Sequence, residues 1–264
     1  MSINSYLMAL SKHAILSSAE KTSINISIAS ISTRLKSFFP NELETHFRFG
    51  SSVRRTILPR KYDLRSDIDY LVVFNDGQFT PQTYLDRLKR FSNFYYKTSV
   101  VRQDFPSVTL NLNHIKFDLV PSVNYWWSGY KIPNNSGNWI ETDPNGFSKE
   151  LETKNVGCSS LIKPCIRLLK IWNAKAGYVF DSYDLEQQVA QMGFLWVDNN
   201  LKAYVFHSFR QLHLSVFTAS WKIEALGRLK RRLDRIEVLS GQGFEGSAQK
   251  LMSEVFIQPS KTAT

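Results

Sequence analysis

Asp67 and Asp69 are the side chains in this sequence that most directly suggest chemistry, because they lie two positions apart in an apolar stretch, DIDYLVVF. Residues two apart in a β-strand point to the same face, so the two carboxylates are expected side by side. Two unit charges about 4 Å apart interact by roughly 4 kcal/mol at an effective dielectric constant near 20, which would raise the pKa of one carboxyl by about 3. A divalent cation removes this conflict, and oxygen ligands without His or Cys favour Mg²⁺ or Mn²⁺.

A second feature lies upstream, where a predicted strand with alternating apolar residues starts at Phe47 and ends at Gly50 and Ser51. Glycine lets the backbone approach a ligand closely, while a serine hydroxyl and exposed N–H groups donate to anionic oxygens. We therefore expect a phosphate-binding turn at these two residues. Such a turn beside a pair of metal-binding carboxylates predicts phosphoryl or nucleotidyl transfer.

The segment HIKFDLV alternates again and places Lys116, Asp118 and Val120 on one face of a further strand. Gly50-Ser51, followed by an Asp-x-Asp strand and then a strand aspartate, resembles the signature of the DNA polymerase β nucleotidyltransferase superfamily. That family has a third carboxylate on a strand next to the Asp-x-Asp strand. The resemblance therefore implies that Asp118 completes the metal site.

The residues after Asp118 resemble a narrower family. DLVPSV, then YKIPN, then W-x-x-x-DP-x-x-F follow in this order between residues 118 and 147. The order is similar to the bacterial cGAS/DncV-like nucleotidyltransferases (CD-NTases, SMODS type), which make nucleotide second messengers in anti-phage defence. The resemblance implies an α/β (α+β) fold, with a polymerase β-like mixed sheet followed by a C-terminal helical lobe.

Two later segments add nucleotide-binding residues by the same resemblance. The sequence RLLKIW is similar to the family helix whose lysine reaches the triphosphate, here Lys170. The sequence SYDLE is similar to the family's S-Y-x-x-E helix start, in which the serine donates to the terminal phosphate and the aromatic ring stacks on a base, here Ser182 and Tyr183. From the residues alone, Lys170 is equally a surface lysine, Ser182 a helix N-cap and Tyr183 a core side chain.

The resemblance implies a mechanism with two cations, Mg²⁺ or Mn²⁺. Asp67 and Asp69 would hold one on the triphosphate, all three aspartates would hold the other near the acceptor hydroxyl, and pyrophosphate would leave. The expected product from nucleoside triphosphates is a cyclic or short linear oligonucleotide, with an effector protein that responds to it. Two alternatives stay open: a template-independent transferase that extends a primer, a protein or an RNA with nucleotides or deoxynucleotides, and a nucleic-acid-binding pseudoenzyme, which the intact set of three aspartates disfavours.

The net charge of the chain indicates which kind of binding partner it favours. The chain has 264 residues, a formal net charge of +10 and a pI near 9.5, which favours an anionic partner such as a nucleotide or nucleic acid. No apolar run approaches a membrane span, and the two cysteines, Cys158 and Cys165, are expected to be free thiols in a cytoplasmic protein. A basic loop is either a solvated surface or a contact for polyphosphate or a nucleic-acid backbone; its cations are Arg54, Arg55, Arg60, Lys61 and Arg65.

The expected elements place these residues in three regions. Residues 1–39 are predicted helical, with a capping box at Ser17 and Glu20, and a further helix is predicted from the cap Thr80 and Pro81 to about residue 96. Strands are predicted over 100–123, a loop over 124–147, a helix over 159–177 and helical structure throughout 201–257. The predicted organisation is a catalytic core with an N-terminal helix (1–150), a helical lobe that closes the nucleotide cleft (151–257) and a disordered tail (258–264).

Overall fold

The structure is a computed structural model that describes residues 2–97, 99–125 and 129–256. It divides into two compact units. Leu16–Arg60 and Arg65–Glu150 form one, here called the sheet unit; the residues up to Ile15, Lys61–Leu64 and the residues from Leu151 onward form the other, here called the helical unit. The division at 150/151 falls where the predicted core meets the predicted lobe, but the first fifteen residues group with the helices. The predicted disordered tail and residues 126–128 of the predicted loop lie outside the described residues.

The sheet unit contains a mixed sheet with the strand order β1-β2-β5-β4-β3. β2 and β5 pair in parallel, and the other neighbours pair antiparallel, which confirms the predicted mixed sheet. β6 pairs with the end of β5, and β7 pairs with β6. The strands are β1 (Leu43–Arg48), β2 (Asp67–Phe74), β3 (Val100–Asp104), β4 (Ser107–Asn111), β5 (Lys116–Tyr125), β6 (Gly129–Pro133) and β7 (Trp139–Thr142).

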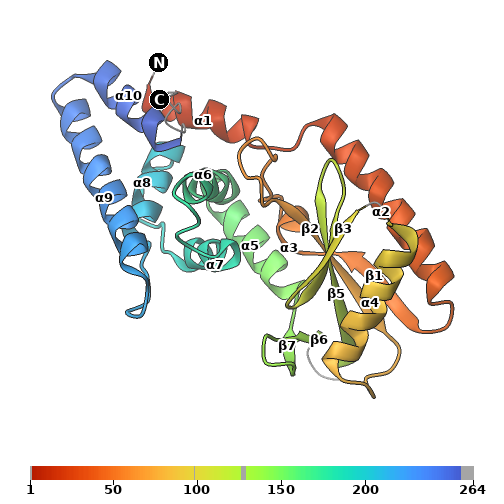
Figure 1. Ribbon diagram of the computed structural model, residues 1–264. Coiled ribbons are helices and arrows are strands. Elements are labelled where there is room, and N and C mark those ends of the chain that lie inside the picture. The colour runs from red at the N-terminus through yellow and green to blue at the C-terminus, as the bar shows by residue number, and fades with distance from the viewer. Residues whose placement is uncertain (1, 98, 126–128, 257–264) are drawn as a thin grey trace, which may run out of the picture. The chain divides into compact units, whose positions relative to one another are not determined.

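Alternation along β2 decides which face of the sheet is covered. Ile68, Tyr70 and Val72 point into a core that α2 (Ser18–Phe38) and α4 (Pro81–Tyr95) complete on one face (Figure 1). Leu71 and Val73 point to the other face, where they form a smaller apolar cluster with Val120 of β5. Asp67 and Asp69 belong to this second face, because they share the odd positions of the strand.

The two predicted helix starts in the sheet unit are confirmed. The Ser17 hydroxyl accepts the N–H of Glu20 at 3.2 Å, and the Glu20 carboxylate accepts the N–H of Ser17 at 2.7 Å, which completes the capping box of α2. Thr80 caps α4, with Pro81 in the first turn. The capping box also divides the predicted helix 1–39 in two, because α1 (Ile3–His13) ends before Ser17 begins α2.

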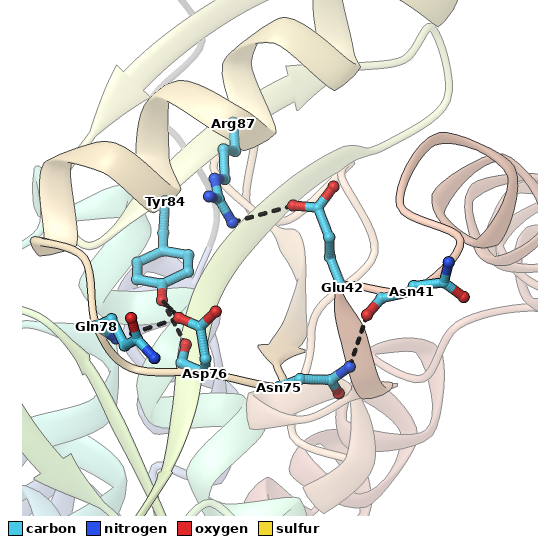
Figure 2. Close-up of polar contacts among 7 residues, drawn as sticks. All are labelled: Asn41, Glu42, Asn75, Asp76, Gln78, Tyr84 and Arg87. Carbon is cyan, nitrogen blue, oxygen red and sulfur yellow. Dashed lines mark hydrogen bonds and ion pairs between the residues drawn. The ribbon is translucent and has the colours of Figure 1, made fainter.

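Polar contacts fix the carboxyl end of β2, away from the aspartates (Figure 2). The Tyr84 hydroxyl of α4 donates to the Asp76 carboxylate at 2.9 Å, and Arg87 of α4 pairs with Glu42 at 3.0 Å. Asn75, which follows β2, donates to the Asn41 carbonyl at 2.9 Å. These contacts tie the carboxyl end of β2 to α4 and to the residues that lead into β1.

The helical unit is organised around α6 (Ile162–Lys175), whose residues from Ile162 to Asn173 are almost all buried. A helix that is buried on nearly every side lies in the interior of a bundle, and α6 contacts α1, α7, α8 and α10. The remaining helices are α5 (Gly146–Gly157), which contains the boundary between the units, α7 (Ser182–Gln191), α8 (Leu201–Gln211), α9 (Ser220–Gly241) and α10 (Glu245–Phe256). No described helix is both long and apolar enough to cross a membrane.

The predicted secondary structure was wrong in two segments. The segment 124–147, predicted as a loop, contains β6 and β7, because each finds backbone partners on a neighbouring strand despite a sequence rich in Asn and Gly. Helical structure does not continue through 201–257: α8 ends at Gln211 and α9 begins at Ser220. Val216 lies between these helices and is 89% exposed.

Candidate active site

The three aspartates come together on the sheet face opposite α2 and α4. In the parallel pairing of β2 with β5, Asp69 lies directly opposite Asp118, and Asp67 lies opposite Lys116. One carboxylate oxygen from each of the three aspartates lies within 4.8 Å of the other two. All three aspartate side chains are half-buried. Further along the same face of the two strands lies the apolar cluster of Leu71, Val73 and Val120.

The electrostatics of the cluster favour a bound cation. Burial, followed by the negative charge of Asp118, raises the pKa of Asp67 from 3.8 to about 6, although Lys116 acts in the opposite direction. The sequence predicted charge repulsion between Asp67 and Asp69, but the charge that raises the pKa of Asp67 is that of Asp118 on the neighbouring strand. Three carboxylates without His or Cys match the ligands that Mg²⁺ and Mn²⁺ prefer, so these residues fit a divalent metal site.

Two further residues of this site were not predicted from the sequence. Thr109 of β4 lies opposite Asp118 and donates its hydroxyl to Asp118 Oδ1 at 2.6 Å, which fixes the orientation of that carboxylate. Lys116 Nζ lies 3.2 Å from Asp67 Oδ2 and 3.2 Å from Asp118 Oδ2. The spacing of Lys116 and Asp118, two apart on one strand face, is the signal that could have indicated this ion pair.

Gly50 provides the space that the Asp69 carboxylate needs. Where the sequence predicted a turn, the structure has a short helix, α3 (Gly50–Arg54), which begins at Gly50. The φ of Gly50 is +68°, a backbone conformation that favours glycine. A Cβ at Gly50 would lie 1.9 Å from Asp69 Oδ2. Ser51 follows in α3, half-buried, and its carbonyl accepts the N–H groups of Thr56 and Ile57. Gly50 therefore lies beside the Asp69 carboxylate of the acidic cluster, and Ser51 follows it in α3.

The nucleotide-binding residues predicted after residue 150 belong to the helical unit; they are Lys170, Ser182 and Tyr183. Lys170 Nζ lies 2.8 Å from Glu186 Oε1, and both side chains are buried, so Lys170 is not a surface lysine. Asp181 is the N-cap of α7 and accepts the N–H groups of Tyr183 and Asp184. Ser182 is therefore the first residue of α7 and not its N-cap. Tyr183 has 44% of its side chain exposed, which excludes the core position.

The basic loop is only partly a solvated surface. Arg54 is buried, with its guanidinium 5.1 Å from the centre of the Phe147 ring, within the sheet unit. Arg55 and Arg65 are exposed. Arg54 thus has a packing role, whereas Arg55 and Arg65 belong to the surface of the loop.

A family profile decides the relationship of the chain. The family described as "SMODS: Second Messenger Oligonucleotide or Dinucleotide Synthetase domain" matches residues 1–155, more than half of the sequence. The chain belongs to the SMODS family. The resemblance to CD-NTases drawn from the motifs is confirmed. Gly50, Ser51 and the three aspartates lie inside the matched SMODS region, whereas Lys170, Ser182 and Tyr183 lie beyond it.

Individual relatives of this SMODS chain agree with the family. A probable cyclic nucleotide synthase of Bacillus cereus (strain VD146) is 26% identical over 162 residues, which are 57% of this chain and 48% of that protein. The match therefore spans about half the length of this curated relative.

Solved structures of CD-NTases have the same fold. The Bradyrhizobium diazoefficiens CD-NTase CdnG in complex with GTP aligns with a TM-score of 0.73 at 12% identity, over 96% of this chain and 98% of that one. Escherichia coli MS115-1 CdnC with ATP aligns with a TM-score of 0.73 at 14% identity, over 100% of this chain and 99% of that one.

The buried ion pair of this SMODS chain leads to a prediction about stability. Replacing Lys170 with methionine leaves the Glu186 carboxylate buried without this cation, so we expect a loss of about 3–5 kcal/mol in the free energy of unfolding, measured with urea. The double variant Lys170→Met/Glu186→Gln should recover a large part of that loss, because it removes the buried charge. Lys250→Met, on the exposed side of α10, is the control and should change stability by less than about 0.5 kcal/mol. A single variant as stable as the control would show that the pair contributes little.

The raised pKa of Asp67 predicts how metal binding depends on pH. Because the carboxyl is protonated below a pH of about 6, a cation must displace that proton, and affinity for Mn²⁺ should fall by up to about tenfold for each pH unit below this value. Without a divalent cation, ionisation of this carboxyl opposes folding, so its contribution to stability is greatest at acid pH and is lost as the pH rises through about 6. Titration of Mn²⁺ binding against pH, with Asp67→Asn as the reference that lacks this proton, tests the first statement, and a pH-independent affinity between about 5 and 7 would contradict it. Urea unfolding of the same two proteins against pH, without divalent cations, tests the second.

Proposed function

We propose that this chain is a metal-dependent nucleotidyltransferase that condenses nucleoside triphosphates, with release of pyrophosphate, into a cyclic or short linear oligonucleotide signal. The observation that carries the proposal is the cluster of Asp67, Asp69 and Asp118, whose carboxylate oxygens lie within 4.8 Å of one another in a chain of the SMODS family. The solved structures with GTP or ATP support ribonucleoside triphosphates as the substrates. Family membership supports a role in bacterial anti-phage defence and an effector protein that responds to the product.

In the proposed reaction, the acceptor hydroxyl loses its proton and its oxygen forms a bond to the α-phosphorus, while the bond to the pyrophosphate oxygen breaks. Two bound Mg²⁺ or Mn²⁺ ions would stabilise the charge that develops on the attacking and leaving oxygens. Asp67 and Asp69 would hold the cation that orients the triphosphate, and Asp118 would join them in holding the cation near the acceptor. Thr109 keeps the Asp118 carboxylate oriented, through its 2.6 Å hydrogen bond.

The remaining proposed roles concern the triphosphate and the base. Ser51 donates its hydroxyl to a phosphate oxygen, beside the space that Gly50 leaves open. Ser182 donates to the terminal phosphate, and the exposed ring of Tyr183 stacks on a base. Lys170 contacts the triphosphate only if its ammonium leaves Glu186, which lies 2.8 Å away.

Incubation with labelled nucleotides tests the proposal. The purified chain receives each NTP and dNTP, singly and mixed, with Mg²⁺ or Mn²⁺, and the products are separated before and after phosphatase and protease treatment. Small phosphatase-resistant products from ribonucleotides are expected. A ladder of linear products, or label that stays on protein or RNA, would instead identify a template-independent transferase. Nucleotide binding without any pyrophosphate release, with the metal site loaded, would identify a pseudoenzyme.

A further inference from the structure

Lys116 lies within the acidic cluster itself. Its Nζ is 3.2 Å from Asp67 Oδ2 and 3.2 Å from Asp118 Oδ2, so one ammonium bridges carboxylates on two strands. The sheet register produces this contact, because Lys116 lies directly opposite Asp67 in the parallel β2–β5 pairing and shares its strand face with Asp118. The side chain is 28% exposed, so most of it is shielded from solvent.

The two oxygens that contact Lys116 belong to carboxylates that would hold a divalent cation. Magnesium binds carboxylate oxygens at about 2.0–2.1 Å. An ammonium 3.2 Å from both Oδ2 atoms and a cation bound by the same atoms cannot share that space.

The hydrogen bond of Thr109 indicates whether the Asp118 carboxylate or the Lys116 ammonium has to move when a cation binds. The Thr109 hydroxyl holds the other oxygen of Asp118, Oδ1, at 2.6 Å, and this neutral contact can remain when a cation binds Oδ2. Lysine is also suited to movement, because its charge lies at the end of a flexible four-carbon stem. The ammonium of Lys116 is therefore the group that has to move.

We propose that Lys116 is an internal counter-cation of the metal site: it holds Asp67 and Asp118 together when no divalent cation is bound, and it is displaced when one binds. This inference rests on the proposed function, because it concerns the same metal site. Displacement of a bound ammonium weakens the binding of a bare cation. Metal loading should therefore be strongest when the cation arrives with the nucleotide triphosphate, whose own charge adds to that of the aspartates.

Manganese binding in the absence of nucleotide tests the proposal without any measurement of activity. The signal of free Mn²⁺ in electron paramagnetic resonance gives the affinity of the wild type, Lys116→Met, Lys116→Arg and Lys89→Met at neutral pH. Lys89 is exposed on α4, so its replacement removes the same charge away from the site. We expect Lys116→Met to bind Mn²⁺ about tenfold more tightly than the wild type, since about 1.4 kcal/mol corresponds to a factor of ten. Lys116→Arg and Lys89→Met should stay within about twofold of the wild type, which is below about 0.5 kcal/mol.

Thermal unfolding gives a second, independent result. Without divalent cations, Lys116→Met should unfold at a lower temperature than Lys89→Met, because Asp67 and Asp118 then repel each other without the ammonium. Saturating Mn²⁺ should raise the unfolding temperature of Lys116→Met more than that of the wild type. Lys116→Gln, which keeps a polar end group, serves as the second variant if the methionine variant does not fold.

Equal or weaker Mn²⁺ affinity in folded Lys116→Met and Lys116→Gln would overturn the role of Lys116, while Mn²⁺ binding by the wild type would leave the proposed metal site in place. An absence of Mn²⁺ binding in the wild type and in every variant would instead contradict the proposed function, and the role of Lys116 with it.

Discussion

Replacing Asp69 with asparagine is expected to lower the rate of nucleotidyl transfer by at least about a thousandfold and to leave the fold intact. Asp69 lies directly opposite Asp118 in the sheet register, and its carboxylate is one of the three oxygen donors that cluster within 4.8 Å. Asparagine keeps the shape but removes the charge, and a loss of about 4 kcal/mol of transition-state stabilisation corresponds to a factor of about a thousand. The side chain is only half-buried, so the free energy of unfolding should change by less than about 1 kcal/mol.

Pyrophosphate release and urea unfolding, measured on the same preparation, test this prediction. Asp86→Asn is the matched control, because Asp86 is an exposed aspartate of α4 that accepts a hydrogen bond from Gln82 at 2.9 Å, away from the cluster. The control should keep wild-type activity. If Asp69→Asn kept a tenth of the wild-type rate, Asp69 would not be a metal ligand in the reaction.

Replacing Gly50 with alanine is expected to lower the rate by at least about a hundredfold without removing any charged or polar side chain. The added Cβ would lie 1.9 Å from Asp69 Oδ2 and 2.7 Å from its Cγ, so the carboxylate has to shift. A displacement of about 1 Å in a reacting group costs about a hundredfold in rate. The φ of +68° adds a backbone strain of about 1 kcal/mol for a residue with a Cβ.

Gly137→Ala separates the collision from the strain. Gly137 also has a positive φ, of +75°, but a Cβ there would have nothing within 4 Å. Both variants should lose a similar amount of stability through backbone strain, and only Gly50→Ala should lose activity and Mn²⁺ affinity. Equal activity in the two variants would mean that the Asp69 carboxylate moves aside without consequence.

The sequence predicted the parts of the fold that local chemistry determines. The capping box of Ser17 and Glu20 and the Thr80-Pro81 start are hydrogen-bonding patterns within one turn, so a few residues suffice to recognise them. The alternation that places Asp67 and Asp69 on one face is equally local. The position of Asp118 opposite Asp69 is not local, and it was expected from the resemblance to a family and not from periodicity.

The features that were missed depend on contacts between distant segments. The gap between α8 and α9 contains neither Gly nor Pro, so no local signal marks it. His213 is held there by the side chain of Gln188 in α7, through bonds of 3.2 Å to its N–H and its carbonyl. The ion pair of Lys116 with Asp67 depends on the register between β2 and β5, and the partner of Lys170 depends on how α6 packs on α7. A single sequence shows the charged residues but not which of them meet.

The membership of α1 in the helical unit has a consequence for the order of events during synthesis. α1 ends at His13, and α6, against which it packs, begins only at Ile162. At about 5–20 residues per second, a ribosome needs roughly 7–30 seconds to make the intervening chain. Within that time the strands and helices from Leu16 to Glu150 have all been synthesised, whereas the buried side chains of α1, Ile3 and Leu7, still lack the surface that covers them. We therefore expect α1 to be the segment of the nascent chain most accessible to chaperones and proteases, and its packing against α6 to come late in folding.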